Sequence, residues 1–350
     1  MKMRSCLPFI LILATSGGTT LAGPLNPLDY AAYGPLVLTS GTASLNTSGN
    51  TPTLTANGIT YAGLVVNGVV VFDFNGISIG QGATLTGSGP LPVALLSRSD
   101  VAIGGTIELS GSNSNPGPGG GSGANYTSGG PGGGNGAPQQ GAGGAGFGGV
   151  GGSGSDYRTY DGRIFPGYSG GLTYGNLAVR LQGGSGGGGE SGGGGGGGIE
   201  IGAVNRITFS QAGLIDAHGG SAGVSCGGGS GGGIFLHAST VLFDPSSTAV
   251  ELNVAGGDGG NGQVNGGPGG GFGAVGGGGG GGRILIEHSS SMFGLGGGGP
   301  IYNLAGGSRG VTASGAGTFS MIAVPEPSSL ALLAVGVLGL YARSRVGRRG

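Results

Sequence analysis

The sequence has few of the residues on which ordinary globular proteins depend. It contains no Trp, only 8% charged residues and two Cys, of which Cys6 lies in the N-terminal leader described below. Cys226 is the other, so an internal disulfide is excluded, which leaves either a bond between molecules or a free thiol. Lys is absent after Lys2, and the body from Gly23 to Val324 keeps seven Arg against thirteen Asp and Glu, hence a formal charge of −6. An acidic body without a basic face argues against nucleic acid as a partner.

Glycine dominates what is present, with 98 Gly in 350 residues, against about 7% in ordinary proteins. The glycine runs alternate with short segments rich in Val, Ile, Leu and Phe, so disorder does not account for the whole chain. No His or Cys pair has the spacing of a zinc site, and no nucleophile motif stands with a His and an acid. We therefore predict no metal, no cofactor and no enzymatic activity.

The first 22 residues have the layout of a secretory signal peptide. Lys2 and Arg4 are followed by the apolar run 7–14, and then by small and polar residues that end at Ala22. We expect signal peptidase to cleave after Ala22, so that the mature chain begins at Gly23.

The C-terminal segment carries a second sorting signal. The tripeptide Pro325-Glu326-Pro327 is followed by an apolar stretch and then by a basic cluster, which consists of Arg343, Arg345, Arg348 and Arg349. These parts, in this order, resemble the PEP-CTERM tag of bacteria that make exopolysaccharide or biofilm. The resemblance implies processing by exosortase, an intramembrane protease-transpeptidase, in addition to signal peptidase.

The physical properties of this segment fit a temporary stay in the membrane. The two prolines keep the motif extended, and the Arg cluster favours the cytoplasmic side. A transmembrane helix over residues 328–342 would be about 22 Å long, shorter than the roughly 30 Å of hydrocarbon. We expect an inner-membrane stage before processing and then a cell-surface or extracellular location; a lasting tail anchor is the alternative.

The body contains five copies of one unit of about 19 to 24 residues. The unit has an apolar strand, a second short strand and a third strand that runs into glycine, and apolar residues alternate with polar ones within each strand. Three short strands per unit predict one coil of a parallel β-helix, in which each coil buries its apolar face against its neighbours. The predicted fold is all-β, a β-solenoid with long Gly-rich loops; a β-sandwich is the alternative. The copies begin at Val71, Ala94, Ile199, Ile234 and Ile284.

These signals divide the chain into a signal peptide (1–22), an N-terminal β cap (23–70), a Gly-rich solenoid (71–323) and the sorting signal (324–350). The glycine-rich excess falls outside the copies, and we expect it to form loops that leave successive coils at one corner. Glycine suits such loops because it accepts any backbone conformation and lets chains approach closely. Residues 153–182, with clustered aromatics, are expected to cover the coils laterally. The glycine-rich segments are 111–152, 183–198, 219–233 and 256–282.

The aligned copies place polar residues in one outward column of the third strand. Stacked about 4.8 Å apart, these side chains form a candidate site for a cation or a polysaccharide, and a polar ladder facing solvent is the alternative. The alignment also puts His237 beside Glu287, and His218 two residues after Asp216; we interpret both as surface polar pairs. The column consists of Thr84, Glu108, Asp216, Asn253 and Asn303.

The sequence thus indicates an exported structural or interaction protein of the cell envelope, extracellular matrix or biofilm. Its expected partners are the two processing enzymes, the membrane before processing, and exopolysaccharide or other envelope components. Two alternatives remain. One is a carbohydrate-active β-helix enzyme such as a polysaccharide lyase, for which the chain has few charges, and the other is an adhesin whose Gly-rich loops contact another cell.

Overall fold

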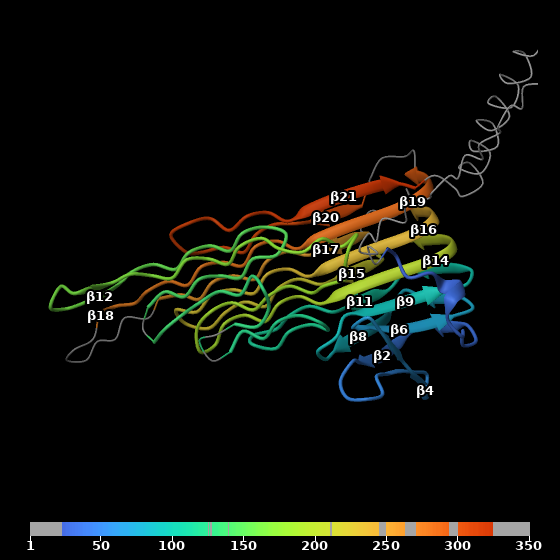
Figure 1. The fold of residues 1–350 in the computed structure, drawn as a ribbon, viewed down its shortest axis with the longest axis horizontal. Helices are drawn as coiled ribbons and strands as arrows, with labels where there is room; N and C mark the ends of the chain where they lie inside the picture. Colours follow the sequence, from blue (N-terminus) through green and yellow to red (C-terminus); the bar gives the residue numbers. More distant parts are fainter. Residues whose placement is uncertain are drawn as a thin grey trace, which may run out of the picture.

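The computed structural model describes residues 23–124, 126, 128–138, 140–210, 212–244, 250–262, 271–293 and 300–324. Within these residues the protein consists mostly of strands, and most strand pairs are parallel (Figure 1). The only helix among them is a 3-10 turn, η1 (Pro27–Asp29). No helix in this part of the chain is long and apolar enough to cross a membrane. The predicted all-β class with parallel sheets is confirmed, whereas residues 1–22 and the predicted helix 328–342 lie outside the described residues.

Two large parallel-rich sheets contain most of the described strands. The first follows the order β1 (Leu36–Leu38), β7 (Ile77–Ile79), β10 (Asp100–Ile103), β14 (Gly198–Phe209), β16 (Gly233–Phe243), β19 (Arg283–Phe293) and β21 (Thr318–Ala323), with β5 (Leu64–Val66), β6 (Val69–Phe74) and β9 (Val93–Ser97) beside this path. The second follows the order β20 (Ile301–Asn303), β17 (Glu251–Asn253), β15 (Leu214–Asp216), β11 (Thr106–Glu108), β8 (Ala83–Ser88), β2 (Gly41–Asn46), β3 (Thr53–Ala56) and β4 (Ile59–Ala62). Because neighbours in each sheet come from successive repeats, every repeat contributes to both sheets.

Equivalent positions of successive repeats pair with one another. Leu85 lies opposite Ile107, and Ile107 lies opposite Ile215. At the N-terminal end β1 and β2 continue this parallel pairing, whereas β3, β4 and β5 pair antiparallel with their neighbours. The change of direction ends the parallel stack within the segment that the sequence indicates as a cap.

The predicted starts of the repeats are wrong by one residue between the second and third copies. Ala94 pairs with Glu200, not with Ile199, which pairs instead with Val93. The reason is the inward-facing pattern: Val93 and Ile199 are both fully buried in the interior between the sheets, and a shift of one residue would turn each side chain to the other face.

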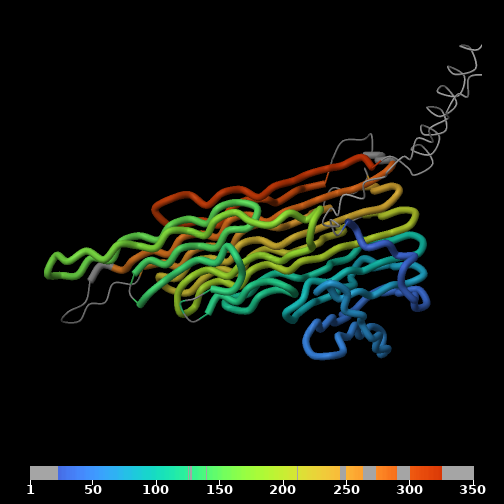
Figure 2. Tube along the Cα trace, in the orientation of Figure 1, coloured from blue at the N-terminus to red at the C-terminus, as the bar shows by residue number. Residues whose placement is uncertain are grey.

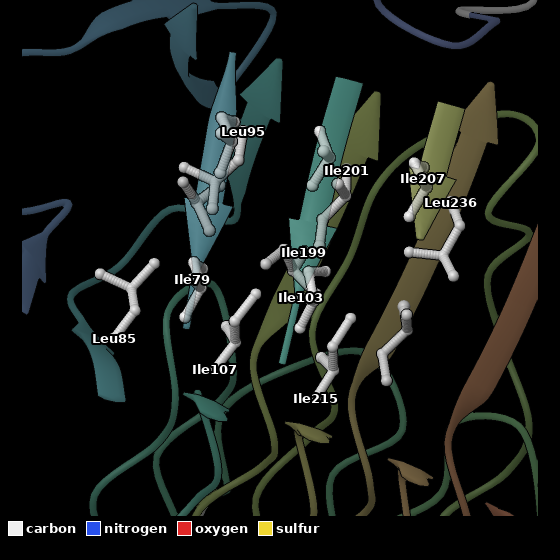
Figure 3. Packing of buried hydrophobic residues seen from close by; sticks show 14 of the residues in the cluster. Ile79, Leu85, Leu95, Ile103, Ile107, Ile199, Ile201, Ile207, Ile215 and Leu236 are labelled. Carbon is white, nitrogen blue, oxygen red and sulfur yellow. The ribbon is translucent and has the colours of Figure 1, made fainter. Parts of the chain in front are cut away.

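The interior between the sheets is filled by Val, Ile, Leu and Phe side chains from the inward positions. Leu85, Ile107 and Ile215, from successive repeats, form one row (Figure 3). Each such side chain contributes about 1.5–3 kcal/mol when it is fully buried. Since the neighbours in a row come from different repeats, a single repeat could not bury its own apolar face.

A second hydrophobic cluster covers the outer face of the first sheet. Phe235 and Leu285 belong to this cluster, and Leu177 and Leu181 pack against them. Residues 177–181 therefore give the lateral cover that the sequence predicts for part of 153–182. Leu25 and Tyr30, from the N-terminal segment, pack at the edge of the same cluster.

The glycine-rich segments lie together, mostly buried, beyond the ends of the strands. These segments connect β11 to β14, β15 to β16, β17 to β19 and β20 to β21. Each connection therefore leads from the second sheet to the first. Figure 2 shows the extended segments running beside one another away from the strands. We call the described parts of 111–152, 183–198, 219–233, 256–282 and 304–317 the glycine bundle.

Backbone hydrogen bonds in the glycine bundle follow a period of three residues. Residues 227–232 donate in rotation to three neighbouring segments, and each neighbour is met again three residues later. An extended helix with about three residues per turn, as in polyproline II, points its successive N–H groups to three sides in this way. The bonds run from Gly227 to Gly188, Gly228 to Gly277, Gly229 to Gly220, Ser230 to Ser185, Gly231 to Gly280 and Gly232 to Ala217, at 2.7 to 3.0 Å.

Close approach, not unusual dihedral angles, explains glycine at these positions. A Cβ on Gly231 would lie 1.9 Å from the carbonyl oxygen of Val254, and one on Gly193 would lie 1.8 Å from that of Gly220. The glycines of 192–198 and 227–232 all avoid positive φ. The expectation of loops with free backbone conformation is therefore corrected: the segments form a close-packed bundle in which a side chain would separate the chains, as at the axis of collagen.

The bundle ends in a three-stranded sheet at the far end from the main strands (Figure 1). Its strands are β12 (Tyr157–Thr159), β13 (Ile164–Phe165) and β18 (Gly271–Phe272), all antiparallel. We call residues 157–165 the tip. Tyr160, Ile164 and Phe165 are exposed there, whereas Tyr157 is buried.

Candidate functional site

The predicted polar column lies along the second sheet. Glu108 is opposite Asp216, Asp216 is opposite Asn253, and Asn253 is opposite Asn303. The structure thus brings these four residues into one register column despite the long insertion between Glu108 and Asp216.

The placement of Thr84 in this column is wrong. Thr86 lies opposite Glu108, and Thr84 lies opposite Thr106, two residues earlier in the register. The inward pair of Leu85 and Ile107 fixes this register, because both side chains are fully buried.

Each of the four column side chains accepts a hydrogen bond from the backbone N–H two residues later. These N–H groups belong to the residues where the chain enters the glycine-rich segments, at the point where the strands of the second sheet end. Asp, Asn and Glu side chains stabilise a chain that leaves a sheet by accepting from its backbone in a local turn. One side-chain oxygen of every column residue is therefore already used in a hydrogen bond to the local backbone. The bonds are Ser110 N–H to Glu108 Oε1 (3.0 Å), His218 N–H to Asp216 Oδ1 (3.1 Å), Ala255 N–H to Asn253 Oδ1 (3.1 Å) and Ala305 N–H to Asn303 Oδ1 (3.4 Å).

His218 adds an ion pair to the column. Its Nδ1 lies 2.7 Å from Oδ1 of Asp216. The hydrogen bond with Asp216 raises the pKa of His218 against the opposing effect of burial, and the charges of Asp216 and Glu108 add to the rise. No group of three His, Cys, Asp or Glu side chains in the described part of the chain is placed to hold a metal ion.

A cavity of about 660 Å³ lies beside the outer face of the first sheet, under the N-terminal segment. We call residues 24–30 the N-terminal strap. The strap forms one wall of the cavity, and β14, β16 and β19 form the other. The lining residues that matter for its chemistry are Pro24, Leu25, His237, Glu287, His288 and Val324.

Glu200 anchors the strap. Its Oε1 accepts a hydrogen bond from the backbone N–H of Leu25 at 2.6 Å and lies 2.9 Å from Nε2 of His237. The alternation within β14 predicts a solvent-facing Glu200, but the residue is only 3% exposed, because the strap and residues 177–181 cover this face. A buried carboxylate without such partners would cost several kcal/mol, on the order of its desolvation.

Glu287 and His288 bring further titratable groups to the cavity. Glu287 lies opposite His237 in the register of β16 and β19. Burial raises the pKa of Glu287; His237 opposes this rise and the charge of Glu200 adds to it. His288 is 8% exposed, and its Nδ1 has no hydrogen-bond partner among the described residues.

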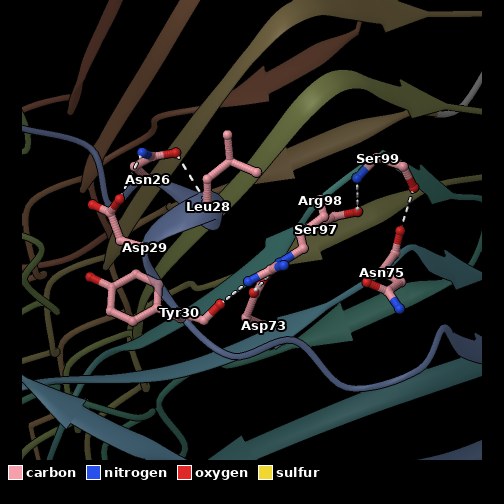
Figure 4. Close-up of polar contacts among 9 residues, drawn as sticks. All are labelled: Asn26, Leu28, Asp29, Tyr30, Asp73, Asn75, Ser97, Arg98 and Ser99. Carbon is pink, nitrogen blue, oxygen red and sulfur yellow. Dashed lines mark hydrogen bonds and ion pairs between the residues drawn. The ribbon is translucent and has the colours of Figure 1, made fainter.

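Arg98 holds the other end of the strap (Figure 4). Its guanidinium donates to the backbone carbonyl of Tyr30 and lies 3.3 Å from Oδ2 of Asp73. Burial raises the pKa of Asp73, while the hydrogen bond and charge of Arg98 oppose that rise. Asn26 is the N-cap of η1, which lies between the two anchors, and its Oδ1 accepts a hydrogen bond from Leu28 N–H at 3.1 Å.

Cys226 is buried inside the glycine bundle. Its Sγ accepts from Ser191 N–H at 3.4 Å and donates to the carbonyl of Val224 at 3.2 Å. Burial raises the pKa of this thiol. In this conformation the thiol is not presented to a second molecule.

The sequence did not point to the buried Glu200 or to the strap, although it holds a signal for them. The outward positions equivalent to Glu200 in other repeats are Ala94, Phe235 and Leu285. Apolar residues at outward positions indicate that something covers the face. The strap and residues 177–181 are that cover.

The predicted sorting residues lie outside the described part of the chain. These are Ala22, Pro325, Glu326, Pro327, Arg343, Arg345, Arg348 and Arg349. Val324, the last described residue, lines the cavity under the strap. The two ends of the described chain thus lie near each other, on the part of the molecule that holds the strands.

Residues 323–349 match the family model of the PEP-CTERM protein-sorting motif. This motif implies an exported chain that exosortase processes. Comparison with curated proteins and with solved structures gives no significant match. The similarity to known proteins therefore covers the sorting segment, and the body has to be interpreted from its own geometry.

Proposed function

We propose that this chain, which carries a PEP-CTERM sorting motif at residues 323–349, is an exported structural protein of the bacterial cell envelope or extracellular matrix and has no enzymatic activity. In this account its strands form a β-solenoid. Signal peptidase removes residues 1–22, and exosortase processes the chain at the Pro325-Glu326-Pro327 motif after a stage in the inner membrane.

The observation that carries this proposal is the direction of the glycine bundle. The described chain ends at Val324, just after β21, whereas the bundle leads away from the strands to the tip at the other end of the molecule (Figure 1). A chain attached at its C-terminal side would project the bundle outward. The bundle pairs its backbone groups internally, which makes it a stiff spacer with few side chains.

The polar column supports a structural role rather than a lyase. Glu108 and Asp216 lie opposite each other and each accept a hydrogen bond from a backbone N–H of their own chain. Their other neighbours in the column are Thr86 and Asn253. A lyase needs acid and base groups that face a substrate. Exopolysaccharide remains the expected partner, bound through the surface of the matrix protein rather than turned over.

The tip favours one second candidate, an adhesin. Tyr160 is 55% exposed, Ile164 53% and Phe165 40%, on a hairpin at the end of the spacer. Aromatic and aliphatic side chains grouped at an exposed end are typical of contact surfaces.

Complementation of a gene deletion separates these functions. Cells would receive the wild-type gene or a double variant of the tip, Tyr160→Ala and Ile164→Ala, with Val179→Ala, exposed elsewhere, as the matched control. The measurements are the exopolysaccharide retained with the cells and the aggregation of the cells. The structural proposal predicts that the deletion loses matrix retention and that both variants restore it.

The other outcomes are distinct. A tip variant that restores retention but not aggregation would favour the adhesin. A deletion strain with an unchanged matrix would contradict the structural role. New unsaturated sugar ends after incubation of purified protein with the exopolysaccharide would contradict the absence of enzymatic activity.

A further inference from the structure

The cavity under the strap holds more acid than the described chain neutralises. The titratable side chains that line it are His237 on β16 and Glu287 and His288 on β19. Glu200 on β14 does not line the cavity, but its Oε1 lies 2.9 Å from Nε2 of His237. Glu200 is bonded to Leu25 and His237, but the carboxylate of Glu287 has no hydrogen bond or ion pair among the described residues. No Arg or Lys side chain of the described residues lines the cavity.

His288 gives an independent indication that a hydrogen-bonding group is missing from this cavity. The side chain is more than nine-tenths buried, it lines the cavity, and its Nδ1 has no partner in the described part of the chain. A buried polar nitrogen without a hydrogen bond is costly. A group that donates several hydrogen bonds and carries a positive charge would satisfy Glu287, and a neutral His288 could accept from it as well. An ammonium group has three such donors.

Because no Arg in the described part of the chain lines the cavity, the group that fits best is an amine. Lys is absent after Lys2, so a chain that begins at Gly23 contains a single primary amine, its α-amino group. Pro24, the next residue, lines the cavity. Arg98, at the other end of the strap, is already bonded to Asp73 and Tyr30.

We propose that this cavity binds the α-ammonium group that cleavage after Ala22 creates at Gly23, with Glu287 as its counter-ion. The inference rests on the proposed function, because it requires removal of the signal peptide at that bond. Binding of a freed N-terminus by carboxylate and backbone groups is a known mode of recognition. The strap is then held at three points, by the ammonium group, by Leu25 on Glu200 and by Tyr30 on Arg98.

The test uses the full chain from Gly23 to Gly350 in detergent, released from an N-terminal fusion by a site-specific protease that leaves no extra residue. Trace labelling with acetic anhydride acetylates its single amine only in the neutral form, and mass spectrometry of the labelled fraction as a function of pH gives the α-amino pKa. The ion pair predicts an α-amino pKa about one pH unit above the usual range of about 7.7–8.0. Glu287→Gln should return the pKa to that range, whereas Glu251→Gln, on β17 of the other sheet, should leave it raised.

A second variant guards against a misfolded Glu287→Gln protein. Adding Gly-Ser before Gly23 moves the amine away without changing the cavity, and it should also return the pKa to the usual range. The proposal is overturned when the wild-type, extended and Glu287→Gln chains share one α-amino pKa. Mass spectrometry of the exported protein tests cleavage separately: a first residue other than Gly23 contradicts the proposed processing, and the titration still decides whether the cavity binds an ammonium group.

Discussion

The substitution Gly231→Ala adds one methyl group where the chains of the glycine bundle meet. The new Cβ would lie 1.9 Å from the carbonyl oxygen of Val254 and 2.8 Å from the backbone nitrogen of Gly282. Ordinary contact begins at 3.4 Å, so the chains must separate by about 1.5 Å. The contacting atoms are backbone, and no side-chain rotation relieves the clash.

The cost follows from the hydrogen bonds that this separation breaks. Gly231 N–H donates to Gly280 at 3.0 Å, and Gly282 N–H donates to Val254 at 2.7 Å. Each buried group left without a partner costs about 1–3 kcal/mol, and overpacking adds about 1–3 kcal/mol. With one unpaired group for each of the two bonds, we expect Gly231→Ala to lower the free energy of unfolding by about 3–9 kcal/mol.

The matched control is Gly34→Ala. Gly34 avoids positive φ, and its added Cβ would meet nothing within 4 Å. Such a change stabilises a protein by about 0.4–1 kcal/mol, because it restricts the unfolded chain. Guanidinium denaturation followed by circular dichroism gives both values. A Gly231→Ala protein as stable as the Gly34→Ala protein would refute the argument that close approach requires glycine in the bundle.

Two further substitutions and one labelling experiment test other parts of the structure. Arg283→Lys should lower the free energy of unfolding by about 2 kcal/mol in the same denaturation assay. The Arg283 guanidinium donates to the backbone carbonyls of Tyr174 and Phe147 at 2.8 to 3.2 Å, and a Lys ammonium cannot reproduce this forked geometry. An unchanged denaturation midpoint would contradict this role of Arg283. The hydrogen bond with Asp216 raises the pKa of His218, so their pair stabilises the fold below about pH 6.5 and this contribution is lost as pH rises through the raised pKa. His218→Asn should abolish that pH dependence of the denaturation midpoint, and an identical profile would contradict the assignment. Cys226 should react with a thiol reagent only after unfolding, since it is 7% exposed and burial raises its pKa; rapid labelling of the native protein would show the opposite.

The parallel pairing could be predicted from the sequence because its determinants are local. Alternation within each strand identifies the buried face, and repetition identifies which strands are neighbours, as the column from Glu108 to Asn303 demonstrates. The register failed between Ala94 and Ile199, where a long insertion separates two copies. Nothing local distinguishes two starts that differ by one residue in β9, because Ala94 and Leu96 on one face are as apolar as Val93 and Leu95 on the other.

The glycine bundle and the strap could not be predicted because their partners are remote in the chain. A glycine run looks the same whether it is disordered or packed, and the order here comes from three neighbouring segments at once. The strap depends on a bond between Leu25 and Glu200, which are 175 residues apart. Such contacts leave only an indirect trace in the sequence, namely apolar residues at outward positions of the covered face.

Mass spectrometry of both termini, on protein recovered from fractionated cells and from the medium, tests the central claim most directly. The account predicts a first residue at Gly23, a chain that ends within or near Pro325-Glu326-Pro327, and recovery at the cell surface or in the medium. An intact chain that ends at Gly350 and stays in the inner membrane would contradict exosortase sorting and the matrix role that depends on it.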